Sequence, residues 1–223
     1  MKETLQKFTD FSVFVGNDIV DLQNPTAHPR FLQRICTSEE QKAVLAYSEP
    51  STALWTLWAI KEATYKAVKK LDPNARFLPK QFTVHDRLFL CHYKHLQANI
   101  YLIQTKDYVH ATALLSEYPL TVLQELKLED QWRISCSTGS GQVIQVISSI
   151  GILPKEALES DAVRKLALTM LKEIGYADCK IIREKKDHQL LPPQVHKEKR
   201  VENLDISLSH DGHYLAATLG IVN

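Results

Sequence analysis

Trp58-Ala59-Ile60-Lys61-Glu62-Ala63-Thr64-Tyr65-Lys66 forms the middle of a helix that the sequence predicts from about Thr52 to Leu71. One stripe of this helix carries two aromatic residues, then a carboxylate and then an ammonium, at spacings of three and four residues: Trp55, Trp58, Glu62 and Lys66. The opposite stripe is mostly apolar and is expected to face a core: Leu57, Ile60, Thr64, Val68 and Leu71. A polar pair below two tryptophans is unusual for a solvated surface, so this helix is a candidate for a functional site.

Glu62 and the lysine four residues later also have the favourable spacing for a simple ion pair within a helix, worth about 0.2–0.5 kcal/mol. If the helix is considered alone, a simple ion pair is a better interpretation of Glu62 and Lys66 than a functional site. A second stretch makes a functional site the better interpretation: Val15-Gly16-Asn17-Asp18-Ile19-Val20-Asp21-Leu22. It lies in a predicted strand from Phe11 to Leu22, in which Gly16 marks a close approach of another backbone or of a ligand. Asp18 lies inside this strand and is a second candidate carboxylate.

Together the two stretches resemble the signature pair of the 4'-phosphopantetheinyl transferases. That signature is a glycine-x-aspartate-isoleucine strand followed about forty residues later by a tryptophan-x-x-lysine-glutamate-alanine-x-x-lysine helix. Either motif alone is moderately specific, whereas both in this order and at this separation are strongly specific. The resemblance is close from about Val13 to Lys70 and looser over the rest of the chain.

The resemblance implies an α+β fold, a pseudodimer of two similar halves in which a long helix packs on a small, mainly antiparallel sheet. Residues 1–118 would form the acidic, metal-binding half and residues 119–223 the coenzyme A-binding half. In the larger, pseudodimeric type, which activates surfactin synthetase, the coenzyme-binding half comes first. Here Asp161-Ala162-Val163-Arg164-Lys165-Leu166 and Ile206-Ser207-Leu208-Ser209-His210-Asp211-Gly212 resemble that half but come second, so the halves look circularly permuted. Junctions of such halves lie at the surface, where cutting and rejoining cost little.

The family moves the phosphopantetheine arm of coenzyme A onto a serine of an acyl or peptidyl carrier protein and releases adenosine 3',5'-bisphosphate. The resemblance therefore implies holo-acyl-carrier-protein synthase activity that depends on Mg²⁺, a cation that prefers oxygen ligands. Asp18 and Glu62 would hold the metal, Glu62 would also act as general base, and Lys66 would stabilise phosphate charge. The residues implied in coenzyme A binding are Ser209, His210, Arg164 and Lys172; an exposed helical cation is the equally ordinary interpretation of the last two.

Two departures from the family pattern bear on this assignment. In the family, the second half has a glycine-lysine-proline turn at the place where this chain has Asp187-His188-Gln189. The lysine contact that the family makes there therefore has no matching residue in this chain. The larger type also has a second carboxylate two residues after the first, where this chain has Val20. Asp21 follows one residue later, as in the small, trimeric holo-acyl-carrier-protein synthases, and would point to the opposite face of a regular strand.

An internal repeat supports the two-half interpretation. A tyrosine, an alanine and a threonine recur 106 residues later: Tyr108, Ala111 and Thr112 as Tyr214, Ala217 and Thr218. The same displacement lays the central helix over a second one, predicted from Lys155 or Ser160 to Ile174 and closed by Gly175. Because Leu168 corresponds to Glu62, the second half is expected to bind no metal.

The composition of the chain argues against a disordered protein, a nucleic-acid-binding protein and a membrane protein. Hydrophobic residues make up 44% and charged residues 24% of 223, which is typical of a globular protein and not of a disordered one. A net charge of +1 gives no general attraction to nucleic acid or to an acidic membrane. No secretory signal is recognised, and Val143 to Leu153 is too short and too serine-rich to span a bilayer. The four separated cysteines predict reduced thiols, and we expect a cytoplasmic monomer.

The remaining pattern predicts connecting elements. Thr37 and Glu40 have the spacing of a capping box at the start of a helix within Arg30–Tyr47. The sequence predicts further strands and hairpins at Gln81–His85, Arg87–Tyr93, Asn99–Leu115, Gln142–Ile150, Lys180–Arg183 and Asp205–Val222. It also predicts a basic loop from Pro192 to Arg200 and a junction at Glu117–Pro119.

Two other functions remain open at this point. One is a catalytically silent module that binds carrier proteins or nucleotides, which the presence of both acidic residues disfavours. The other is a Mg²⁺-dependent phosphohydrolase, in which a positioned water would replace the protein serine. Only the resemblance separates this second possibility from the transferase.

Overall fold

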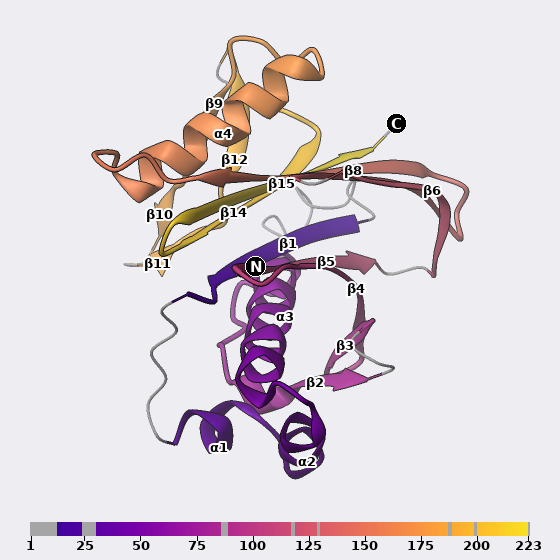
Figure 1. The fold of residues 1–223 in the computed structure, drawn as a ribbon. Coiled ribbons are helices and arrows are strands. Elements are labelled where there is room, and N and C mark those ends of the chain that lie inside the picture. Colours follow the sequence, from indigo (N-terminus) through magenta and orange to yellow (C-terminus); the bar gives the residue numbers. More distant parts are fainter. Residues whose placement is uncertain are drawn as a thin grey trace.

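The computed structural model describes residues 13–23, 30–85, 89–116, 119–128, 130–186, 189–198 and 200–222. It shows an α+β fold with two antiparallel five-stranded sheets. Helix α4 (Glu159–Glu173) covers one sheet and helix α3 (Pro50–Leu71) covers the other, so the layers follow the order α4, sheet, sheet, α3 (Figure 1). No helix of the described part of the chain is long and apolar enough to span a membrane.

The first sheet has the strand order β1-β5-β4-β3-β2. Its strands are β1 Val13–Asp21, β2 Phe82–His85, β3 Leu90–Tyr93, β4 Leu96–Gln104 and β5 Tyr108–Ser116. These strands confirm the sequence prediction, and the hairpin predicted at Asn99–Leu115 turns at Lys106-Asp107. The short helices α1 (Phe31–Ile35) and α2 (Ser38–Ala46) precede α3, and a 3-10 turn, η2 (Pro79–Gln81), follows it. Helix α3 starts two residues before the predicted Thr52 because Pro50, with its fixed φ, occupies its first turn.

The second sheet has the strand order β14-β15-β8-β7-β6. Its strands are β6 Leu120–Lys127, β7 Gln131–Thr138, β8 Val143–Ile152, β14 Leu204–Asp211 and β15 Tyr214–Val222. The predicted last hairpin and second helix are confirmed. Gly175, at φ +92°, closes α4 as predicted, with the amide of Tyr176 donating to Leu171 O and that of Gly175 to Lys172 O.

Two parts of the second half differ from the prediction. The region between the predicted junction and Gln142, for which the sequence analysis predicted no strand, holds β6 and β7. The predicted loop from Pro192 to Arg200 is wrong in part, since it contains β12 (Gln194–Lys197) and β13 (Arg200–Val201), and β12 pairs with β9 (Lys180–Ile182). A two-stranded ribbon lies beside them, made of β10 (Lys185–Lys186) and β11 (Gln189–Leu190). The polar composition of this region favoured a loop, but backbone pairing with β9 makes part of it a strand.

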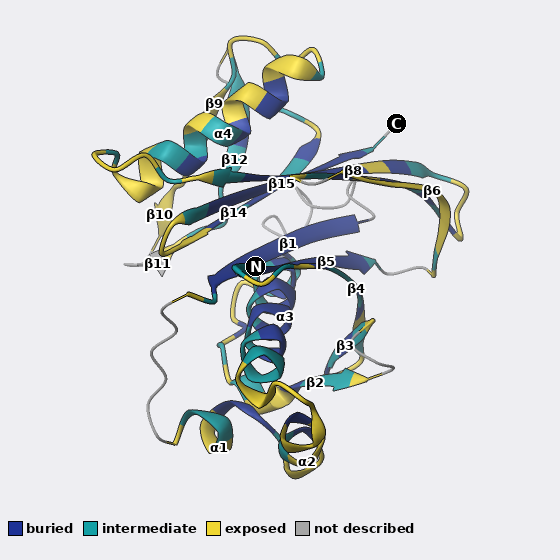
Figure 2. Cartoon of the chain, in the orientation of Figure 1, coloured by how far each residue is buried: buried dark blue, intermediate teal, exposed yellow. Residues whose placement is uncertain are grey.

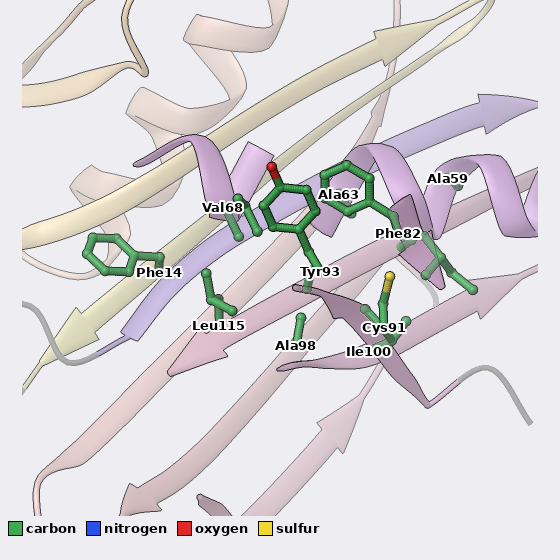
Figure 3. Close-up of a cluster of buried hydrophobic side chains, with 14 of the residues drawn as sticks. Phe14, Ala59, Ala63, Val68, Phe82, Cys91, Tyr93, Ala98, Ile100 and Leu115 are labelled. Atoms are coloured by element: carbon green, nitrogen blue, oxygen red, sulfur yellow. The ribbon is translucent and has the colours of Figure 1, made fainter. Parts of the chain in front are cut away.

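Close packing of α3 on β1 explains the glycine of the first motif. A Cβ atom at Gly16 would overlap the carbonyl oxygen of Ala63, so this position requires glycine. Ala59, Ala63 and Ala67 are fully buried along the same face of the helix. Below them lies a cluster of buried side chains that includes Phe82 and aromatic and aliphatic residues of β3, β4 and β5 (Figure 3). Every residue of β1 is buried, as is the face of α3 that packs on it, whereas the start of α3 and much of α4 are exposed (Figure 2).

The outer edge of β1 meets β14 through side chains instead of a backbone ladder. Alternate β1 amides donate to polar side chains of β14: Val15 N to Asp205 Oδ2 at 2.7 Å, Asn17 N to Ser207 Oγ at 2.9 Å and Asp21 N to Asp211 Oδ2 at 2.8 Å. We call this arrangement the side-chain ladder. Buried Lys70 strengthens it, since its Nζ lies 2.6 Å from Val15 O and 2.8 Å from Asp205 Oδ2. The ladder satisfies donors that an edge strand would otherwise leave open.

The residues of the predicted repeat lie where the two sheets meet. Strands β5 and β15 are offset by 106 residues and each lies second in its sheet. Thr112 and Thr218 both hydrogen-bond the hydroxyl of Ser148, at 3.0 and 2.5 Å, and the rings of Tyr108 and Tyr214 lie 4.8 Å apart. In the first sheet β1 lies beside β5, and in the second sheet β14 lies beside β15 in the same way. Strand β14 follows β1 by 190 residues in the sequence. The strands of the two sheets therefore follow different orders along the chain.

Candidate functional site

Asp18, Glu62 and Lys66 come from two elements of the first half that pack on each other, β1 and α3. Asp18 lies on β1, on the face toward α3, and the other two residues lie one helical turn apart on α3. Lys66 Nζ lies 2.7 Å from Asp18 Oδ1 and 2.9 Å from Asn17 O. The lysine of the motif therefore pairs with the strand carboxylate, whereas a simple ion pair within the helix would join it to Glu62.

The electrostatics of the two carboxyl groups are coupled. Burial, and then the nearby charge of Asp18, raise the pKa of Glu62 to about 7, against the opposing effect of Lys66. Burial also raises the pKa of Asp18; Lys66 opposes this and the charge of Asp211 adds to it. The raised pKa values mean that the two carboxyl groups do not readily ionise together. A divalent cation bound to both would stabilise their ionised forms.

The shifted pKa of Glu62 gives a stability prediction for the metal-free protein. Between pH 4.5 and about 7 the folded protein keeps a proton on Glu62 that the unfolded chain releases. Raising the pH through this window should therefore lower the free energy of unfolding. We expect urea unfolding at pH 5 and pH 7.5 to show a smaller drop for Glu62→Gln than for wild type. Equal drops in the two proteins would contradict the raised pKa.

The donor set fits a hard cation that takes part of its coordination from a ligand. In the described part of the chain, no three His, Cys, Asp or Glu side chains come together as a metal site. Asp18 and Glu62 could supply two carboxylates, leaving the remaining positions to phosphate oxygens and water, which is how Mg²⁺ is usually held.

The carboxylate of Asp21 is hydrogen-bonded to residues outside the group formed by Asp18, Glu62 and Lys66. Its Oδ1 accepts from Gln23 N at 2.9 Å, and its Oδ2 accepts from His213 N at 3.0 Å and lies 2.7 Å from His213 Nδ1. Burial would raise the pKa of Asp21, but these hydrogen bonds lower it. Gly212, at φ +52°, lies so close that a Cβ there would overlap the Asp21 carboxylate. Asp21 therefore ties β1 to the last hairpin, a contact that the sequence did not predict.

A cleft of about 230 Å³ extends from Lys66 into the second half. Its walls come from α3, the first turns of α4, the segment after β9 and strand β14. Cationic side chains line it from three of these elements: Lys66, Lys69, Lys70, Arg164 and Arg183, with His210 beside them. A chain of net charge +1 thus gathers positive charge locally, next to the two carboxylates.

Of the four predicted coenzyme-binding residues, Arg164 and His210 line the cleft. His210 Nδ1 lies 3.1 Å from Glu159 Oε2. Ser209 is buried, does not line the cleft, and its hydroxyl has no hydrogen-bond partner among the described residues. It alternates with Ser207 and Asp211 of the side-chain ladder, so it faces β1. Lys172 is exposed in the last turn of α4, about 12 Å along the helix beyond Arg164, and lines no part of the cleft.

The sequence interpretation missed Arg183, Lys69 and Lys70 of the cleft, and it gave no role to Lys61. Arg183 lines the cleft, and its place among the basic residues after Lys180 was the available signal. Lys61, inside the helix motif, is fully buried and has a structural role, since its Nζ lies 2.7 Å from Glu40 Oε2 and 2.8 Å from Ile35 O. The predicted departure at Asp187-His188-Gln189 lies largely outside the described residues.

A larger cavity of about 600 Å³ lies between α2, the start of α3 and β2. It includes Glu40 and His85 but none of the predicted site residues. The smaller cleft is the better candidate site because it joins the cationic groups to Asp18 through Lys66.

Comparison with known proteins agrees with the first motif pair. Residues 14–122 match the family model of the 4'-phosphopantetheinyl transferase superfamily. This range holds β1 except Val13, helix α3 and the other four strands of the first sheet, with Asp18, Glu62 and Lys66. A search of the curated proteins found no match.

Proposed function

We propose that this chain, whose residues 14–122 form a domain of the 4'-phosphopantetheinyl transferase superfamily, transfers 4'-phosphopantetheine from coenzyme A to a serine of an acyl or peptidyl carrier protein. The observation that carries the proposal is the meeting of Asp18, Glu62 and Lys66 at one end of a cationic cleft. Such a cleft suits a ligand with several phosphates, and the carboxylates suit the metal that phosphoryl transfer requires.

In the proposed reaction the serine Oγ forms a bond to the phosphorus that bears the pantetheine arm. The bond from that phosphorus to the bridging oxygen breaks, and adenosine 3',5'-bisphosphate leaves. Glu62 would accept the serine proton, directly or through a bound water. Lys66 would donate to a phosphate oxygen and stabilise the charge of the transition state.

Mg²⁺ held by Asp18 and Glu62 would neutralise charge on the diphosphate as the bond breaks. Before a ligand binds, Lys66 holds Asp18 at 2.7 Å and so keeps the carboxylate in place. We propose that the second half binds coenzyme A, with Arg164 and His210 among its contacts. The positions of Ser209 and Lys172 support no direct contact from either.

Residues 1–118 and 119–223 are proposed as the two halves of a permuted pseudodimer. Support comes from the shared second position of β5 and β15, and from the unequal offsets of 106 and 190 residues for neighbouring strands. Val13 and Val222, which lie near the two ends of the described part of the chain, also pack on the same hydrophobic cluster. With a complete pair of halves in one chain, we expect a monomer, and with four free cysteines we expect the cytoplasm.

A reordered variant tests the two-half proposal. It begins at Leu120, continues to Asn223, passes through a short flexible linker to Met1 and ends at Pro119. Because the new ends fall between β5 and β6, all ten strands of the two main sheets stay intact. We expect a single cooperative urea transition and retained transfer. An aggregated or molten product would show that the halves are not separable units.

Mass spectrometry tests the function itself. Candidate apo carrier proteins are incubated with the chain, coenzyme A and Mg²⁺, and we expect the carrier to gain the mass of phosphopantetheine. Release of phosphate from coenzyme A without that gain would favour the phosphohydrolase. Carrier binding without either reaction would favour the silent binding module.

A further inference from the structure

The larger cavity, of about 600 Å³, is separate from the site of the proposed reaction. It lies between α2, the first two turns of α3, strand β2 and the end of β4. None of the residues proposed for metal, coenzyme or serine chemistry lines it. Its volume falls within the range of sites that bind small organic molecules, about 300–1,000 Å³.

One part of the cavity wall is apolar. Val44 of α2 and Leu57 of α3 are buried there, in a hydrophobic cluster that α1, α2 and α3 share. Ala53 and Val84 pack on the same cluster but are only partly buried, and both line the cavity. Part of this apolar surface is therefore open to the cavity, where an apolar group of a ligand could cover it.

The buried polar groups of the wall already have partners within the protein. Glu40 Oε2 lies 2.7 Å from Lys61 Nζ, and Glu40 Oε1 accepts from Val84 N at 3.1 Å. The hydroxyl of Thr56 donates to Thr52 O at 2.8 Å. These groups are satisfied without a ligand, so charge recognition falls to the exposed side chains of the cavity.

Two of those exposed side chains are carboxylates that no cation neutralises. Glu39 lies in the first turn of α2 and Glu49 directly before α3. Neither forms an ion pair within the described part of the chain, and the carboxylate of Glu49 accepts only a hydroxyl hydrogen bond there, from Thr52 at 3.2 Å. Among the described residues, no lysine or arginine lines the cavity. The cavity is therefore negative, in contrast to the cationic cleft.

The surroundings of the two carboxylates favour an organic cation over a metal ion. No three His, Cys, Asp or Glu side chains of the described residues come together as a metal site. The carboxylates also stand beside apolar surface, which a hydrated metal ion would leave uncovered. Tyr47, directly after α2, adds a half-exposed aromatic ring to the wall, against which an ammonium or guanidinium group can lie.

We propose that this cavity binds a small organic cation, an ammonium or guanidinium group carried on an apolar body. The apolar body would lie against Val44, Ala53 and Leu57. The cation would lie beside Glu39 and Glu49. The inference does not depend on the proposed reaction, although helix α3 contributes its first turns to the cavity and its later turns to the cleft.

Calorimetric titration at low ionic strength tests the site with three probes. 4-Phenylbutylamine carries both features of the proposed ligand. 4-Phenylbutyrate has a similar apolar body with the opposite charge, and n-butylamine has the cation with less apolar surface. We expect wild type to bind 4-phenylbutylamine about tenfold or more tightly than either control probe. Equally tight binding of either control probe, or no binding of 4-phenylbutylamine, would overturn the site.

Charge variants show where the cation binds. Glu39→Gln/Glu49→Gln removes both carboxylates of the cavity. Glu156→Gln/Glu173→Gln is the matched control, since Glu156 and Glu173 are exposed in the second half and do not line the cavity. We expect the first variant to lose about tenfold or more of the affinity for 4-phenylbutylamine, and the control to bind like wild type. Similar affinities in the two variants would contradict the proposal.

Ala43→Phe tests the apolar part of the site. Ala43 is exposed on α2 and lines the cavity, so a phenyl ring there would occupy part of the space. The affinity for 4-phenylbutylamine should fall by about tenfold or more. Urea unfolding shows whether this variant is folded, and unchanged binding in the folded variant would place the probe outside the cavity. If it does not fold, the charge variants decide, because they change only exposed residues. No probe contains phosphate and no carrier protein is present, so the result is independent of the transfer assay.

Discussion

Glu62→Gln and Asp18→Asn should each lower the rate of phosphopantetheine transfer by at least about a hundredfold. Both substitutions remove a proposed metal ligand, and Glu62→Gln also removes the proposed base. The effect should persist at saturating Mg²⁺, because a neutral amide cannot replace the missing charge. Transfer is measured as the mass gained by the carrier protein over time.

Glu173→Gln is the matched control, since Glu173 is an exposed carboxylate at the end of α4. It should transfer at the wild-type rate. Circular dichroism and urea unfolding of both site variants should show a folded protein. A near wild-type rate in either site variant would remove Asp18 and Glu62 from the proposed mechanism.

Lys61→Met should lower the free energy of unfolding by about 3–5 kcal/mol, the usual cost of removing one partner of a buried ion pair. Lys61 Nζ joins three segments, since it lies 2.7 Å from Glu40 Oε2, 2.8 Å from Ile35 O and 3.1 Å from Pro79 O. Glu40 would be left buried without its cation. Equilibrium urea unfolding measures the loss.

Lys42→Met is the control for this substitution, because Lys42 is exposed on α2 and makes no ion pair among the described residues. It should change the free energy of unfolding by less than about 0.5 kcal/mol. If Lys61→Met were as stable as Lys42→Met, the buried pair would contribute nothing net to the fold.

Local signals account for what the sequence predicted well. The Thr37 and Glu40 spacing predicted a capping box, and the structure has both of its hydrogen bonds. Gly16 predicted a close backbone approach, and Ala63 makes it. The positions of Asp18 and Glu62 followed from one strand and one helix, because each motif folds as a single element.

Features that depend on distant segments were not predictable from local pattern. The burial of Lys61 needs the ends of α1 and η2 to converge on one helix face. The orientation of Ser209 follows from the register of β14 against β1, which are 190 residues apart. Strand β7 is a different case, because the alternation of its buried Trp132, Ile134 and Cys136 with polar residues was a local signal that the sequence interpretation missed.

The side-chain ladder also bears on how the chain is made. Its donors belong to β1 and its acceptors to β14, so the strand that carries Asp18 is completed by residues synthesised 190 positions later. At roughly 5–20 residues per second, that delay on the ribosome lasts roughly 10–40 s. Through this interval β1 presents an open edge to other nascent chains. Translation that stops before Asp205 would therefore yield a product that contains Asp18, Glu62 and Lys66 but is prone to intermolecular strand pairing.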